Sequence, residues 1–396
     1  MAIRTGRALG WVASAWAAVF FVGAGYRVLA DCSAFGLPFT DLGTTSFCAQ
    51  IAEAYYTGLS NGTSATAYSP SATVSREQMA AFVTRTLDQS LLRGSRRAAL
   101  NQWWNSSPHY DQSLGLTTVG AGTALLASDG EDVWVASYTD ATVTRVRASD
   151  GKVQQTWTGA TGATGVLVAM GRVFVTSYTI PGNLYMIDPT ATAGAVTTVT
   201  SSLGSHPTGI AFDGNRIWTA NDGGSVSIVT PGTWAVTSPT AGFSHPIGAL
   251  FDGANVWVTD QGDNKLKKLN SDGSVAQAVT VGTTPLLPIF DGRNIWVPDN
   301  GAASLTVVRA SDGVVLKTFS PGTGDSNGMN GPQVAAFDGQ RILVTNFFGG
   351  LALFQATSLS PIGAIATPGM GSPYGACSDG VSFWVGDGDA NHIGRF

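Results

Sequence analysis

Apolar and polar positions repeat from Leu114 to the end of the chain, with a period near 41 residues. In each unit a short apolar run leads into a two-residue turn, and a second apolar run, usually containing an aromatic residue, follows it. Apolar runs of strand length joined by turns that need a positive φ predict β-hairpins. The turn is Met170-Gly171 in one unit and Asp-Gly in the others, at residues 129–130, 213–214, 252–253, 291–292, 338–339 and 379–380.

Further Asp-Gly turns extend the hairpins into larger units. They stand at residues 150–151, 272–273 and 312–313, where they would join a third strand to a fourth. A repeat of about 40 residues with four strands is typical of a β-propeller blade. The seven units therefore predict a mainly β fold, a seven-bladed β-propeller over residues 113–396.

The two ends of this region predict how the propeller closes. The last unit stops at residues 392–396, which complete only its third strand, whereas residues 114–120 resemble a fourth strand such as residues 278–282. We therefore expect the N-terminal strand to close the last blade and so remove two free sheet edges.

The pattern before the repeats is helical. Residues 47–58 predict a short helix with Ile51 and Tyr55 on one face, and a turn-rich stretch follows. A second helix begins at Ser75, whose hydroxyl and the Gln78 side chain can form a reciprocal capping box, with Val74 and Met79 as the apolar staple beside it. Residues 31–90 thus predict a small α-helical module, and residues 91–112 a connector.

The order of these elements resembles an S-layer homology motif. The resemblance implies binding to an anionic cell-wall polymer, with Arg76 at the position of the family's contact arginine. This chain carries one such motif where the family usually has three, and reads Ser-Arg-Glu-Gln where the family has Thr-Arg-Ala-Glu. The matching segments are residues 39–41, 58–62, 68–70 and 74–79.

The first residues predict export. Arg4 and Arg7 precede an uncharged stretch over residues 8–25, and small or apolar residues stand at Val28 and Ala30. This pattern predicts a signal peptide over residues 1–30; retention of the segment as a membrane anchor is the alternative. Either outcome places the chain outside the cytoplasm, secreted or at the cell surface. In that oxidising compartment Cys32 and Cys48 are expected to form a disulfide.

Charge excludes one class of partner. Only 12% of the residues are charged and the formal net charge is -5, while 50 residues are glycine. The repeats carry no basic stripe that could follow a phosphate backbone, so we expect no nucleic-acid binding.

The second strands of the repeats resemble those of the Tyr-Val-Thr-Asn (YVTN) propeller repeats and, more distantly, NHL-type repeats. The resemblance implies the propeller fold, but these propellers include scaffolds, ligand binders, lyases and lactonases. The segments that carry it are Val175-Thr176-Ser177, residues 257–260 and residues 343–346.

Alignment of the units places one polar residue just after each second strand. Such residues either cap their own turns or form a rim that could hold a divalent cation, the one cofactor that these side chains suit, or a polar ligand. The aligned residues are Ser137, Ser177, Asn221, Asp260, Asp299, Asn346 and Asp387.

Two histidines occupy equivalent places in adjacent units. His206 and His245 each precede a proline and a first strand, where the other units have Gly122, Ala163, Thr284, Gly331 and Ser372. Together with the neighbouring Asp260 they could form a metal or general-base site, although two duplicated loops would give the same pattern.

These observations support two functions of different classes, and a purely structural spacer in a surface layer, for which the propeller face would be dispensable, is a third possibility. The first is an exported surface protein whose propeller binds a ligand or a protein without catalysis, through the candidate rim of His206, His245, Asn221, Asp260, Asp299, Asn346 and Asp387. The alternative is an extracytoplasmic metal-dependent lyase or lactonase-like enzyme with its site on the propeller face. A divalent ion at the rim would distinguish the two.

Overall fold

The computed structural model describes residues 37–42, 51, 54–55, 60, 62–76, 78–80, 82, 115–321, 327–367 and 369–396. The chain divides into two units, Met1–Ala99 and Leu100–Phe396. The predicted signal peptide, the connector and the expected disulfide between Cys32 and Cys48 lie outside the described residues.

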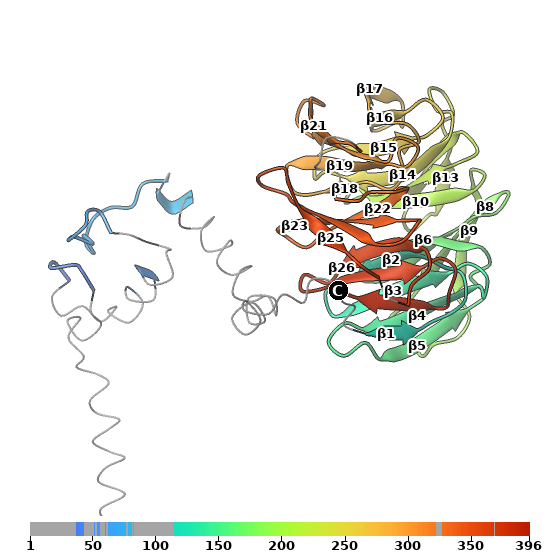
Figure 1. The fold of residues 1–396 in the computed structure, drawn as a ribbon, viewed down its shortest axis with the longest axis horizontal. Coiled ribbons are helices and arrows are strands. Elements are labelled where there is room, and N and C mark those ends of the chain that lie inside the picture. Colours follow the sequence, from blue (N-terminus) through green and yellow to red (C-terminus); the bar gives the residue numbers. More distant parts are fainter. Residues whose placement is uncertain are drawn as a thin grey trace, which may run out of the picture. The chain divides into compact units, whose positions relative to one another are not determined.

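The second unit is built from seven four-stranded antiparallel sheets, so the prediction of a mainly β, seven-bladed propeller is confirmed (Figure 1). Blade 1 comprises β2 (Thr123–Ser128), β3 (Asp132–Ser137), β4 (Thr142–Arg147) and β5 (Val153–Thr158). Blade 2 comprises β6 (Ala163–Ala169), β7 (Arg172–Ser177), β8 (Gly182–Ile187) and β9 (Thr197–Leu203). Blade 3 comprises β10 (Pro207–Phe212), β11 (Ile217–Asn221), β12 (Ser225–Thr230) and β13 (Ala235–Thr237).

The remaining blades follow in chain order. Blade 4 comprises β14 (Pro246–Phe251), β15 (Val256–Asp260), β16 (Lys265–Leu269) and β17 (Val275–Thr280). Blade 5 comprises β18 (Ile289–Phe290), β19 (Asn294–Asp299), β20 (Ser304–Arg309) and β21 (Val315–Phe319). Blade 6 comprises β22 (Pro332–Phe337), β23 (Arg341–Asn346), β24 (Leu351–Gln355) and β25 (Ser360–Ile365). Blade 7 comprises β26 (Pro373–Ser378), β27 (Phe383–Asp387) and β28 (His392–Arg395), together with β1 (Leu116–Thr118).

The seventh blade is made from both ends of the propeller. β1 pairs antiparallel with β28, with Thr117 opposite Ile393. Figure 1 shows β26 of this blade beside β2 of the first blade, where the ring closes.

The first strands of the blades lie next to one another at the centre of the ring. Small residues permit this close approach. A Cβ atom on Gly165 would lie 2.1 Å from the backbone oxygen of Thr208, and one on Gly375 would lie 2.0 Å from that of Ala124. Glycine at these positions therefore allows neighbouring blades to meet backbone to backbone.

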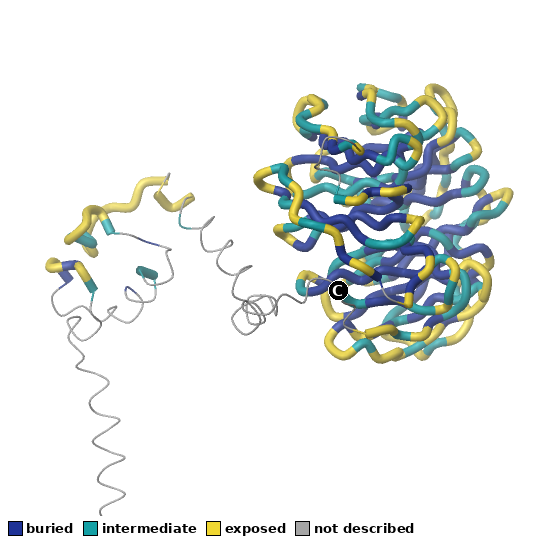
Figure 2. Tube along the Cα trace, viewed as in Figure 1, coloured by how far each residue is buried: buried dark blue, intermediate teal, exposed yellow. Residues whose placement is uncertain are grey.

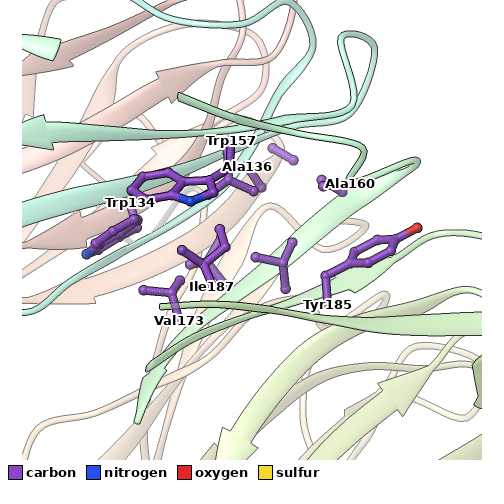
Figure 3. Close-up of a cluster of buried hydrophobic side chains, with 12 residues drawn as sticks. Trp134, Ala136, Trp157, Ala160, Val173, Tyr185 and Ile187 are labelled. Atoms are coloured by element: carbon purple, nitrogen blue, oxygen red, sulfur yellow. The ribbon is translucent and has the colours of Figure 1, made fainter. Parts of the chain in front are cut away.

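The hydrophobic core lies between the blades (Figure 2). Second strands are buried on both faces, which explains their nearly continuous apolar runs. Figure 3 shows one seam, where Trp134 and Trp157 of blade 1 pack with Val173, Tyr185 and Ile187 of blade 2.

The Asp-Gly turns have a second function besides reversing the chain. In blade 4, Asp252 accepts the backbone N–H groups of Ala254 and Asn255, and its other oxygen accepts the indole N–H of Trp257 at 2.7 Å. The same aspartate-to-tryptophan bond recurs in blades 1, 3, 5 and 7. Blade 2, which has Met170 in place of the aspartate, has Phe174 in place of the tryptophan.

The first unit confirms the predicted capping box. The Ser75 N–H donates to Gln78 Oε1 at 2.9 Å, and the Gln78 N–H donates to Ser75 Oγ at 3.2 Å. Phe39 packs among Leu42, Ile51 and neighbouring tyrosines. Val74 and Met79, the predicted staple, are 49% and 53% exposed.

Candidate binding face of the propeller

One end of the propeller collects the loops that the sequence singled out. The start of each inner strand pairs with the end of the second strand, as Pro207 does with Asn221 and Pro246 with Asp260. The loops that join second to third strands therefore lie at the same end as the residues that precede the inner strands. We call this end the channel face.

The seven aligned polar residues lie beneath this face and are at most 1% exposed. Asn221 donates to the hydroxyls of Ser225 and Ser227, and the Asp387 carboxylate accepts the N–H groups of Gly371 and Ser372. The side chains thus hold their own blades together, as the turn-capping interpretation expects. Five candidate rim residues, Asn221, Asp260, Asp299, Asn346 and Asp387, are buried instead of facing solvent.

Asp260 is held by a buried lysine that the sequence analysis missed. Lys267 lies 2.7 Å from Asp260 Oδ2 and 2.6 Å from Asp263 Oδ2. Burial opposes ionisation of Asp260, but the bonds from Lys267 and from the Ser244 and His245 N–H groups outweigh it and lower the pKa of the carboxyl.

Asp299 occupies the same position in blade 5 without a cation. It accepts bonds from the Ser304 and Thr306 hydroxyls, and its Oδ1 has no hydrogen-bond partner among the residues described. Burial raises the pKa of this carboxyl to about 7. The same aligned position therefore holds an ionised carboxylate, Asp260, in blade 4 and an acid with a pKa near neutral pH, Asp299, in blade 5.

The two histidines do lie on the channel face, but their partners differ from those expected. The His245 side chain is 58% exposed, and its Nδ1 lies 3.2 Å from Asp222 Oδ1. Asp260 contacts only the backbone N–H of His245. The expected grouping of the histidines around Asp260 is therefore wrong, and Asp222 takes its place at His245.

His206 adopts a positive φ of 56°, and its ring stacks on Tyr178 with centroids 4.3 Å apart. Its equivalent in blade 2 is Gly162, and not Ala163 as the alignment suggested. A backbone hydrogen bond that repeats between blades shows the correspondence. In each case the residue after the aligned polar residue donates its N–H to the carbonyl oxygen at the position of His206: Asp222 N donates to His206 O, and Tyr178 N to Gly162 O. A histidine thus stands in a backbone conformation that three other blades give to glycine.

Asp222 is the centre of a cluster that joins three blades. Its carboxylate accepts the Tyr178 hydroxyl at 2.9 Å from blade 2 and the Gln261 amide at 3.1 Å from blade 4. Burial and the bond to Asp222 raise the pKa of Tyr178 to about 12, so its hydroxyl stays a donor. We call Tyr178, His206, Asp222, His245 and Gln261 the three-blade cluster. Asp222 directly follows the aligned residue Asn221. Comparing the next residue of each unit, in addition to the aligned one, could have identified it from the sequence.

Large apolar side chains are exposed on the same face. They project from the loops after the second strands of blades 1, 2 and 6: Tyr138 is 47%, Ile180 69%, Phe347 42% and Phe348 71% exposed. Exposed apolar groups of this size are typical of binding surfaces.

The described part of the chain contains no cluster of side chains that matches the expected divalent-cation site. There, no three side chains of His, Cys, Asp or Glu gather as metal ligands would. Likewise, within the described residues no helix is both long and apolar enough to cross a membrane. Arg76, the expected polymer contact, is exposed beside the capping box.

Comparison with known proteins gives different matches for the two units. Residues 38–80 match the S-layer homology domain. The propeller is similar to the crystal structure of the WD40 β-propeller domain of Doa1, with a TM-score of 0.60, 14% identity, and coverage of 72% of this chain and 96% of that one. It is also similar to Kuenenia stuttgartiensis hydrazine synthase, with a TM-score of 0.59, 14% identity, and coverage of 71% and 96%. No curated protein matches the sequence.

At such identity these structural likenesses concern the fold alone. An S-layer homology domain indicates association with the cell surface and its wall polymers. The protein therefore joins an S-layer homology domain at residues 38–80 to a seven-bladed β-propeller.

Proposed function

We propose that this protein is exported, attached to the cell wall through its S-layer homology domain, and uses the channel face of its propeller to bind a ligand or a partner protein. The observation that carries the proposal is the three-blade cluster on a face that also carries exposed aromatic side chains. Polar groups from separate blades converge around Asp222, and aromatic rings on other loops of the same face stay uncovered.

Attachment is assigned to the helical module and Arg76. The guanidinium is exposed and follows Ser75, whose capping box supports the start of a helix at this point. An exposed arginine can form paired hydrogen bonds with the phosphate or carboxylate groups of an anionic wall polymer. Export through the signal peptide over residues 1–30 and a common origin with YVTN or NHL repeats belong to the same proposal.

The contacts and exposure of the polar groups on the channel face favour binding over catalysis. Most of the buried aligned residues form hydrogen bonds within their own blades, and the exposed groups are aromatic rings, amides, carboxylates and one oriented imidazole. Such a mixture favours recognition of a surface over chemistry at a single bond.

The test mixes the full chain with purified cell envelopes and follows both units at once. We expect the protein to sediment with the envelopes, Arg76→Ala to reduce sedimentation, and the exposed Arg293→Ala control to leave it unchanged. Hydroxyl-radical footprinting of the bound protein should protect Phe348 and Tyr138 on the channel face and leave Met170, exposed at the opposite end, reactive. Equal reactivity of Phe348 with and without envelopes would contradict a binding role for this face.

A further inference from the structure

The channel face carries an excess of negative charge. The seven loops that join second to third strands contain Asp140, Asp222, Asp263 and Asp389, and they contain no lysine or arginine. These loops are residues 138–141, 178–181, 222–224, 261–264, 300–303, 347–350 and 388–391.

Most of these loop carboxylates are not paired with a lysine or arginine among the described residues. Asp263 shares Lys267 with the buried Asp260, so a single ammonium group serves two carboxylates. The other loop aspartates accept bonds from neutral donors: Asp140 from the Ala121 N–H, and Asp389 from the Ser372 hydroxyl. Asp222 is bonded by Tyr178, Gln261 and the His245 ring. A face with these contacts repels anionic polymers and attracts cations.

Aromatic rings lie on three loops of the channel face, and two of these rings are near the loop carboxylates. Tyr138 precedes Asp140 by two residues in one loop, and Tyr178 bonds Asp222 directly. Phe348, the most exposed of the rings, lies close to Gly331 in blade 6. Aromatic faces next to carboxylates suit long cationic side chains, because the aliphatic stem packs on the ring while the charged end pairs with the acid.

From this combination we infer that the channel face binds a lysine- or arginine-rich segment of a partner protein. The inference rests on the proposed binding function and names the class of partner. A neutral glycan would use the rings but gains nothing from the charge, and an anionic wall polymer would be repelled. The two units therefore recognise opposite charges: Arg76 an anionic polymer, and the channel face a cationic protein segment.

The test uses the full chain and a short fluorescein-labelled peptide of alternating Lys and Gly, followed by fluorescence anisotropy. A matching Glu and Gly peptide and an oligosaccharide of N-acetylglucosamine are the competing probes. We expect binding of the lysine peptide alone, weakening as salt rises from about 0.01 M to about 0.1 M and the Debye length falls from about 30 Å to about 10 Å.

Variants locate the binding. Asp140→Asn, Asp222→Asn and Phe348→Ala should each weaken the lysine peptide about threefold to tenfold. Asparagine at 222 can accept the Gln261 amide through its carbonyl oxygen and donate to the Tyr178 hydroxyl through its amide nitrogen, and the Asp140 side chain makes one backbone contact, so thermal unfolding should confirm that both variants fold. Asp312→Asn, which removes an exposed carboxylate from the turn after β20 at the opposite end, is the matched control and should bind normally.

Three results would overturn the inference. They are equal binding of the glutamate peptide, an unchanged affinity in all three face variants, and preferential binding of the oligosaccharide with the same sensitivity to Phe348→Ala. In the last case the binding face itself would stand and only the class of partner would be wrong. Failure of every probe, together with footprint protection of Phe348 by envelopes, would also reject a cationic partner while retaining the proposed function.

Discussion

Asp260 and Asp299 show how one neighbouring residue decides the charge of a buried acid. Each is the last residue of a second strand and both are fully buried, but the third strand opposite supplies Lys267 to the first and Thr306 to the second. A cation stabilises the ionised form of Asp260, whereas the neutral hydroxyl and backbone donors around Asp299 do not offset its burial. The two pKa values therefore move in opposite directions from the same position in the fold.

Asp299→Asn should stabilise the protein above neutral pH. The folded pKa of about 7 lies above the ordinary value of 3.8, so the native state holds the proton more tightly than the unfolded state. This contribution to stability is full below the unfolded pKa, falls as pH rises towards 7, and is absent above it. Asparagine also suits the site, because Asn221 makes the equivalent bonds to Ser225 and Ser227 in blade 3.

Thermal unfolding from about pH 4 to about pH 8 measures the effect, with a gain on the order of a few kcal/mol expected at the upper end. The contrasting variant is Lys267→Met, which leaves Asp260 buried without its cation and should lower stability at neutral pH. An Asp299→Asn protein with the same pH dependence as the wild type would contradict a raised pKa.

Threonines of the second strands connect adjacent blades at the element scale. Thr259 of β15 accepts the N–H of Gly248 in its own blade at 2.9 Å and donates to the Leu286 oxygen in the segment leading to β18 at 2.6 Å. Thr176 and Thr345 make the same pair of bonds in blades 2 and 6. This geometry gives a physical reason for threonine in the Val-Thr pairs that the sequence analysis noted.

Thr259→Val should lower the free energy of unfolding by about 1–3 kcal/mol, because the buried Gly248 N–H would lose its acceptor while the side-chain volume hardly changes. Chemical denaturation of the full chain measures the loss. Thr318→Val on the outer strand β21, where the residue is exposed, controls for the change of residue type. Equal stability of the two variants would mean that the bond between blades 4 and 5 contributes nothing.

Closure of the ring is a property of the whole molecule. β1 and β28 come from opposite ends of the propeller and hold the seventh sheet together, so the seven described sheets form a closed ring. Because each blade packs on two neighbours, opening one seam exposes apolar surface and an unpaired edge.

Thr117→Pro should weaken this closure, since proline removes a donor from the middle of β1. We expect a midpoint of thermal unfolding lower by several degrees and dimers or larger species in size-exclusion chromatography. Thr117→Val keeps the backbone donor and removes only the hydroxyl bond to Gly151, so it should remain monodisperse. A monodisperse Thr117→Pro protein with an unchanged midpoint would show that the seam is not needed for stability.

The repeat number, the Asp-Gly turns and the Ser75 capping box were determined by the sequence itself, because each depends on residues a few positions apart and on a period that needs no long-range contact. The apolar second strands likewise identified the core. What the sequence could not reveal were contacts between blades. Asp222 meets Tyr178, 44 residues earlier, and His245, 23 residues later, through the ring geometry alone.

Burial was likewise decided only by the tertiary structure. Aligned polar residues at the end of a strand suit a solvent-facing rim and a buried cap equally well, and only the tertiary structure shows that Asn221, Asp260 and Asp299 are buried. The exposure of Phe348 and the pairing of Lys267 with two acids were likewise visible only in the folded structure. Local patterns therefore determined the architecture, while the spatial arrangement of the blades determined which side chains remain available for binding.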